Sequence, residues 1–163
     1  MNGREIHTTN EQGAYLHTEM DDFVVIKLHG QIVDILCEMK PEYKKFVVYE
    51  NGKVTLYMQL MKALYGCIKS ALLWYELFTG ELRDKGFKLN PYGKCVTNKM
   101  INGKQCTMAW WVDDSFLTNL SAMVLDRIIE RIKLKFSKMA VTKGDKHTTL
   151  GMKLMFLEMA WSG

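Results

Sequence analysis

Alternating and β-branched apolar residues surround two Asn-Gly pairs. Asn51-Gly52 lies within FVVYENGKVTLYM, and Asn102-Gly103 lies within VTNKMINGKQCTMAW. An Asn-Gly pair between such runs is the strongest short-range signal for a β-hairpin, because a two-residue type I′ turn needs positive φ at both positions. Each pair therefore predicts two antiparallel strands joined by a tight turn.

Two other segments carry apolar side chains at helical spacing. The first lies between Ser70, a candidate N-cap, and Gly86, a candidate stop; the second begins after Ser121, also a candidate N-cap. The apolar stripes are Leu73, Trp74, Leu77, Phe78 and Leu82 in the first segment, and Leu125, Ile128, Ile129, Ile132 and Phe136 in the second. Both patterns predict amphipathic helices.

Two further strands complete the expected arrangement, one around Gly13 to Leu16 and one in the ending HTTLGMKLMFLEM. With the first hairpin set aside as an insertion, the order becomes β-α-β-β-α-β. This order predicts a ferredoxin-like α+β fold, an antiparallel sheet with two helices on one face. The 163 residues fit a single domain. Such a fold hosts many functions and does not identify one.

Composition and charge narrow the class of protein. Hydrophobic residues make up 48% of the chain, which argues against disorder, and no apolar run approaches the roughly 18 residues of a membrane span. The start, MNGREIHTTNEQ, lacks the apolar stretch of a secretory signal, and the four cysteines show no CxxC spacing. We therefore expect an intracellular protein with free thiols, no membrane span and no secretion.

The basic residues are concentrated in the C-terminal third. From Arg127 to Lys153 there are eight Lys or Arg residues against Glu130 and Asp145, a balance of +6. Because the whole chain has a net charge of +4, the residues outside this segment carry a net charge of −2. Such a segment suits contact with phosphates, and it equally suits a solvated helix face.

Two adjacent aspartates, Asp113 and Asp114, interrupt the apolar segment CTMAWWVDDSFLTN. They fall at the turn after the strand predicted for residues 107–112. Carboxylates there could bind a divalent metal such as magnesium together with a carboxylate from another strand, and they could equally form an ordinary solvated turn. Of Trp110 and Trp111, which must face opposite sides of a strand, one is expected in the core.

Several motifs occur in the order found in the palm of copia-type retrotransposon reverse transcriptases, which this chain resembles. The family's A-[FY]-L-[HN], K-x-L-Y-G-x7-W, Y-V-D-D and L-G-[MI] motifs match Ala14 to His17, Lys62 to Trp74, Val112 to Asp114, and Leu150 to Met152. The resemblance implies RNA-directed DNA polymerisation with magnesium ions held by Asp113 and Asp114. It also implies an RNA or DNA template-primer and a deoxynucleoside triphosphate as partners, contacted by Trp111, Lys62, Lys69 and Tyr15.

Asn10 occupies the position of the family's third metal-binding aspartate. A neutral amide oxygen there replaces a bridging anion, so we expect weak magnesium binding and impaired or absent polymerisation. Glu11 should point to the opposite strand face and cannot take over the role.

A second function stays open beside the first. The resemblance covers a palm, and we expect the fingers to be mostly missing and the thumb and RNase H domains to be absent. A palm of this kind could serve as a non-catalytic structural subunit whose exposed edges are covered by protein partners in a larger assembly.

Overall fold

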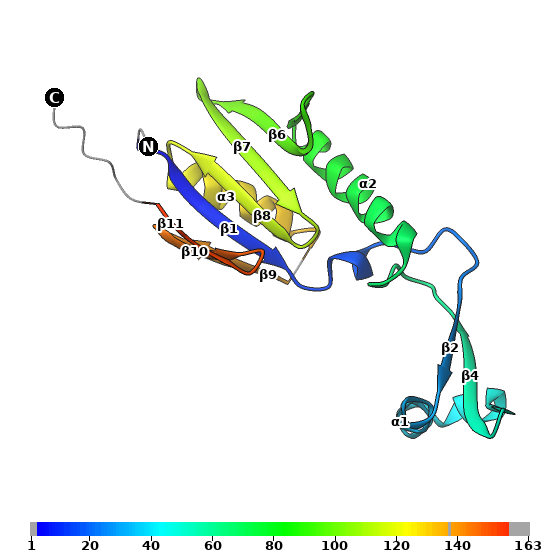
Figure 1. The fold of residues 1–163 in the computed structure, drawn as a ribbon. Helices are drawn as coiled ribbons and strands as arrows, with labels where there is room; N and C mark the ends of the chain where they lie inside the picture. The colour runs from blue at the N-terminus through cyan, green and yellow to red at the C-terminus, as the bar shows by residue number, and fades with distance from the viewer. Residues whose placement is uncertain (1–2, 137, 157–163) are drawn as a thin grey trace.

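A six-stranded antiparallel sheet forms the centre of the fold in the computed structural model, which describes residues 3–136 and 138–156 (Figure 1). Its strand order is β5-β6-β7-β8-β1-β9. In the order of the sheet, the strands are β5 (Lys88–Asn90), β6 (Gly93–Ile101), β7 (Lys104–Trp111), β8 (Asp114–Asn119), β1 (Glu5–Glu11) and β9 (Met139–Lys143). Without β5 and β6, the strands run 2-3-1-4 in chain order, as in the ferredoxin-like arrangement that the sequence predicts.

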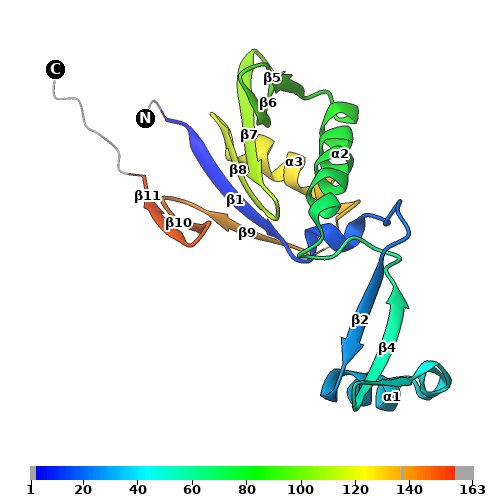
Figure 2. The same cartoon turned by 45° about the vertical axis from the view of Figure 1, so that its right-hand side comes forward.

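Two helices, α2 (Ile68–Asp84) and α3 (Ala122–Lys133), cover one face of this sheet, as Figures 1 and 2 show. Their apolar stripes and the inward side chains of the strands form the main core. Its fully buried members include Leu82, Met108, Leu117, Leu125 and Ile132. The prediction of an α+β fold with both helices on one face is confirmed. Among the described residues, no helix has the length and apolar character needed to span a bilayer.

Both Asn-Gly hairpins are confirmed. Asn51 and Gly52 have φ values of 49° and 74°, and Asn102 and Gly103 have values of 50° and 73°. The first pair joins β3 (Val48–Glu50) to β4 (Lys53–Gln59), and the second joins β6 to β7. The positive φ angles at both positions are those of a type I′ turn.

The helix termini differ in part from the prediction. Gly86 does end α2, at φ 80° directly after the C-cap Lys85. However, α2 begins at Ile68, and Ser70 lies inside its first turn, where its hydroxyl accepts a hydrogen bond from the backbone N–H of Leu64 at 3.0 Å. Ser121 occupies the N-cap position of α3, although its side chain makes no capping hydrogen bond.

The prediction of a strand around Gly13 to Leu16 is wrong. The strand β1 lies earlier, and the segment Ala14–His17 forms a 3₁₀ helix, η1. Gly13 has φ 74°, which ends the extended chain, and its carbonyl accepts a hydrogen bond from the backbone N–H of Leu16 at 2.8 Å. This left-handed conformation costs glycine little, so the chain turns sharply here.

The last strand is also placed differently. The described part of HTTLGMKLMFLEM forms a separate hairpin of β10 (Lys146–Thr149) and β11 (Met152–Met155), while residues 157–159 lie outside the described chain. The turn is Leu150-Gly151, with φ values of 51° and 71°. The strand that completes the main sheet is β9, which pairs with β1. Its short, mixed sequence MAVTK carries little periodicity that would have revealed it.

The insertion between η1 and α2 is more than a hairpin. It contains β2 (Val25–His29), α1 (Gln31–Met39), a 3₁₀ helix η2 (Pro41–Phe46), β3 and β4, in a sheet of order β2-β4-β3. Figures 1 and 2 show this unit projecting from the main sheet. Its core is separate and centres on Val33, Cys37 and Leu56.

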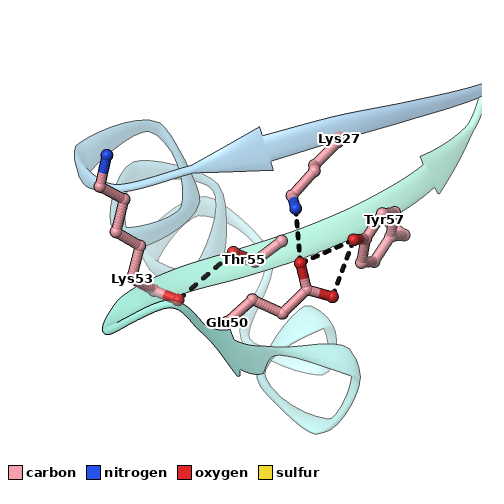
Figure 3. Close-up of polar contacts among 5 residues, drawn as sticks. All are labelled: Lys27, Glu50, Lys53, Thr55 and Tyr57. Carbon is pink, nitrogen blue, oxygen red and sulfur yellow. Dashed lines mark hydrogen bonds and ion pairs between the residues drawn. The ribbon is translucent and has the colours of Figure 1, made fainter.

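A polar network crosses one face of the inserted sheet (Figure 3). The Glu50 carboxylate accepts hydrogen bonds from the Lys27 ammonium at 2.5 Å and from the Tyr57 hydroxyl at 2.8 Å. These bonds join β2, β3 and β4, and Lys27 lowers the pKa of Glu50. Because all three side chains are substantially exposed, the network contributes little stability compared with the apolar core beneath it.

Candidate functional site

Three of the predicted site residues lie in one row on the sheet face away from the helices. Asn10 on β1 pairs with Asp114 on β8, which pairs with Trp111 on β7. Directly paired residues place their side chains on the same face, which we call the outer face. The prediction that one tryptophan lies in the core is confirmed, since Trp110 is 6% exposed and Trp111 is 65% exposed.

The Asn10 side chain makes a direct contact in this row. Its amide Nδ2 donates a hydrogen bond to Oδ1 of Asp114 at 3.1 Å. The other carboxylate oxygen, Oδ2, accepts a hydrogen bond from the backbone N–H of Leu150 at 3.1 Å. Both oxygens of Asp114 are therefore satisfied by protein donors.

Asp113 lies in the two-residue turn between β7 and β8, where the backbone is constrained. Val112 has φ 51°, an unfavourable value for a β-branched residue. Its carbonyl accepts a 2.8 Å hydrogen bond from the indole N–H of Trp74, and the Asp113 carbonyl accepts a 2.7 Å hydrogen bond from the backbone N–H of Glu11. One contact from α2 and one from β1 thus hold this turn in place.

Glu11 lies on the helix side of β1, as strand alternation predicts. It is 2% exposed, and its Oε1 is 2.7 Å from Nε2 of His17, while its Oε2 has no hydrogen-bond partner among the described atoms. Burial raises the pKa of Glu11, and the hydrogen bond from His17 opposes that rise. Glu11 therefore cannot supply the carboxylate that is missing at Asn10. No sequence pattern indicated this pair, because the histidine lies on η1 and not on the strand.

The β10–β11 hairpin covers part of the outer face. Nδ1 of the buried His147 is 2.9 Å from the Thr8 hydroxyl, and the Phe156 ring lies 5.9 Å from that of Phe116. Beside these contacts runs a groove of about 360 Å³ between the hairpin and strands β6, β7 and β8. Its lining includes Val96, Ala109, Trp111, Asp114, Phe116, Leu150 and Met152. Asp114 and Trp111 of the row thus line a largely apolar groove.

The remaining predicted residues lie at the junction of η1, the inserted unit and α2. The buried ring of Tyr15 lies 4.4 Å from that of Tyr65, whose pKa is raised by burial and then by the nearby charge of Asp113. Lys69 forms ion pairs with Asp22 at 2.8 Å and Asp21 at 2.9 Å, which raise its pKa.

Lys62 is exposed, and its backbone forms an isolated antiparallel β-bridge with that of Glu19. Neither predicted lysine therefore joins the Asn10, Asp114 and Trp111 row.

The residues present do not fit a two-magnesium site. Magnesium needs oxygen acceptors, but Asn10 and Leu150 direct N–H donors at the two oxygens of Asp114. Among the described residues, no three His, Cys, Asp or Glu side chains gather closely enough to hold a metal ion. The arrangement offers one carboxylate on the face, a second in the adjacent turn and an exposed indole.

Compared with models of known protein families and with curated proteins, the sequence matches none. Among solved structures, apo telomerase from Candida tropicalis is similar over 95% of this chain, with a TM-score of 0.47 and 10% sequence identity. The chain spans 32% of the length of that telomerase chain. The resemblance to copia-type reverse transcriptases therefore depends on the sequence motifs.

Proposed function

We propose that this chain is a reverse-transcriptase-like palm whose ancestral reaction was RNA-directed DNA polymerisation and which no longer polymerises efficiently. The sequence motifs support this origin, as does the placement of the aspartate pair at the turn of a central hairpin in a ferredoxin-like sheet. The exposed Trp111 and the adjoining groove offer a surface on which a primer end could stack. Copia-type ancestry remains part of the proposal.

The observation that carries the proposal is the hydrogen bond from Asn10 to Asp114. In a two-metal polymerase site, carboxylates from neighbouring strands share the ions. Here the neighbouring strand supplies an amide that donates to the carboxylate, so a metal would have to displace this donor and would gain only a neutral oxygen. The fold is retained, and the ion-binding chemistry is weakened at one position.

The direct test restores the anion with Asn10→Asp. Isothermal calorimetry should show at least about tenfold tighter magnesium binding than in the unaltered protein, because a second carboxylate then faces Asp114. Asn98→Asp is the matched control: it adds the same charge on the same sheet face, on β6, away from the aspartate pair. Equal magnesium affinity in the unaltered and Asn10→Asp proteins would contradict the proposal.

A primer-extension assay with magnesium or manganese tests the activity itself. We expect no extension by the unaltered protein and detectable extension by Asn10→Asp, with Asn98→Asp remaining inactive. Efficient extension by the unaltered protein would show that the neutral residue is no obstacle.

The exposed apolar side chains favour a second candidate, a structural subunit. Ile68, Tyr92, Leu134 and Phe23 are 99%, 98%, 88% and 78% exposed, respectively. A protein partner that covers these side chains would remove their apolar surface from water. On this proposal the isolated chain self-associates in light scattering and co-purifies within a larger assembly. A monodisperse monomer at high concentration would count against it.

A further inference from the structure

A second groove lies on the helix side of the fold, remote from the row of Asn10, Asp114 and Trp111. It has a volume of about 380 Å³ and runs between the end of β6 and one side of α3. Its floor includes the apolar side chains of Ile101, Val124 and Ile128, and its cationic rim consists of Lys99, Arg127 and Arg131. We call this feature the basic groove.

Among the described residues, neither arginine of the rim forms an ion pair with the carboxylates around α3. The ion pairs of that region join Asp126 to Lys143 and to His7, and Glu130 to Lys133. None of these pairs includes Arg127 or Arg131, both of which are exposed. The two arginines lie four residues apart on α3, a spacing at which like charges repel each other.

More positive charge adjoins the rim. The Lys99 ammonium donates a 2.5 Å hydrogen bond to the Lys85 carbonyl, which places it at the C-terminal end of α2. Burial lowers the pKa of Lys85, and the charges of Lys135 and Arg131 lower it further. Glu81 contacts both Lys85 and Lys135 and is the carboxylate within this group. Lys85 and Lys135 thus lie beside the rim and are paired with Glu81.

This combination of an apolar floor and an unneutralised basic rim suits one kind of ligand. Arginine guanidinium groups bind phosphate oxygens with two parallel hydrogen bonds and also stack on bases. An apolar floor can contact a sugar or an unstacked base, which a double helix keeps inside. A volume near 380 Å³ is within the range of pockets that hold small ligands of nucleotide size.

We propose that the basic groove binds the sugar-phosphate backbone of a single-stranded nucleic acid, with Arg127 and Arg131 on the phosphates and the apolar floor against a sugar or base. This site lies on the opposite side of the sheet from the aspartate pair, so it does not depend on the outer face. It also gives a role to Arg127 and Arg131, two of the eight basic residues between Arg127 and Lys153.

The experiment measures fluorescence anisotropy of labelled oligothymidine and oligouridine of about 12 nucleotides over a series of salt concentrations. The variant Arg127→Gln/Arg131→Gln should bind about tenfold more weakly at low salt. The plot of log affinity against log salt should be flatter by about 1.4, because each phosphate contact on a single strand contributes about 0.7 to the slope. Arg127→Lys/Arg131→Lys keeps both charges but loses the forked donors, so it should keep the salt dependence and lose part of the affinity.

The matched control is Lys44→Gln/Lys45→Gln, which removes the same charge from exposed residues of η2 in the inserted unit. It should change the affinity less than twofold. Equal losses in the two double variants would mean that only net charge matters and would overturn the proposal. No binding by the unaltered protein, or equally tight binding of duplex DNA, would also overturn it.

A competition experiment tests whether the groove binds an acidic protein instead of a nucleic acid. Polyglutamate should displace the oligonucleotide poorly; displacement as effective as that by unlabelled oligothymidine would assign the groove to acidic polypeptides and refute the nucleic-acid proposal. The anisotropy measurements are made without magnesium and with Asn10 unaltered, so they do not involve the metal chemistry of the outer face. Failure of this proposal is therefore distinguishable from failure of the proposed magnesium chemistry at the outer face.

Discussion

Replacing Trp74 by phenylalanine tests how the turn that carries Asp113 is held. The indole of Trp74 is 2% exposed, stacks on Phe78 and donates a 2.8 Å hydrogen bond to the Val112 carbonyl. Trp74→Phe removes this donor and leaves a partly buried carbonyl without its partner. We therefore expect a loss of unfolding free energy from the hydrogen bond and a further loss from the smaller ring.

The two contributions can be estimated separately. An unsatisfied buried acceptor costs about 1–3 kcal/mol, and the partial burial of this bond places the value toward the lower end, about 1–2 kcal/mol. The smaller ring leaves a cavity of about 40 Å³, which at about 24 cal/mol per Å³ adds about 1 kcal/mol. The total is about 2–3 kcal/mol, a large part of the roughly 5–15 kcal/mol typical of a domain.

Trp110→Phe is the matched control, because Trp110 lies in the same core and packs edge-on against Phe78. Among the described atoms its indole makes no hydrogen bond comparable to that of Trp74, so Trp110→Phe should cost only the cavity contribution. The assay is urea unfolding followed by far-UV circular dichroism, which does not depend on tryptophan fluorescence. Equal losses in the two variants would refute the conclusion that the indole donor holds the turn.

Three further predictions concern other parts of the fold. Gly80→Ala should raise the unfolding free energy by about 0.5–1 kcal/mol, since Gly80 lies inside α2 with open space at its Cβ position. Gly103→Ala should lower it by about 1 kcal/mol, since φ is 73° there, and urea unfolding measures both changes. Burial lowers the pKa of His7 below its usual 6.5 despite the nearby Asp126, so the unfolded chain binds the proton more readily and stability should fall as the pH drops below about 6.5; this slope should be weaker in His7→Gln. Leu56→Ala should cost about 2–5 kcal/mol locally and remove hydrogen-exchange protection from β2 and β4 while β7 and β8 keep theirs; equal loss in both sheets would contradict a separate core.

The site could be predicted from the sequence only in part. The position of the aspartate pair after a strand and the opposite faces of Trp110 and Trp111 follow from strand alternation, which is a local property. The hydrogen bond from Leu150 to Asp114 joins residues 36 positions apart and depends on how the last hairpin lies over the sheet. No periodicity along the chain contains that information.

Local chemistry determined much of the fold. The positive φ values at Asn51-Gly52 and Asn102-Gly103, the stop at Gly86 and the apolar stripes of α2 and α3 are properties of short segments, and the sequence alone predicted each of them. These signals are strong because neighbouring residues settle them without help from distant contacts.

Tertiary structure decided the remaining features. The extended segment of β1 precedes the predicted strand, because β1 is stabilised by pairing with β8 on one side and with β9 on the other. Strand β9 has little periodicity of its own and joins the sheet through its pairing with β1. The pairing of Glu11 with His17, the separate core of the inserted unit and the unneutralised rim of the basic groove likewise depend on which distant residues meet. Folding brings these groups together only when the whole chain has packed, so their energies do not appear in any single stretch of sequence.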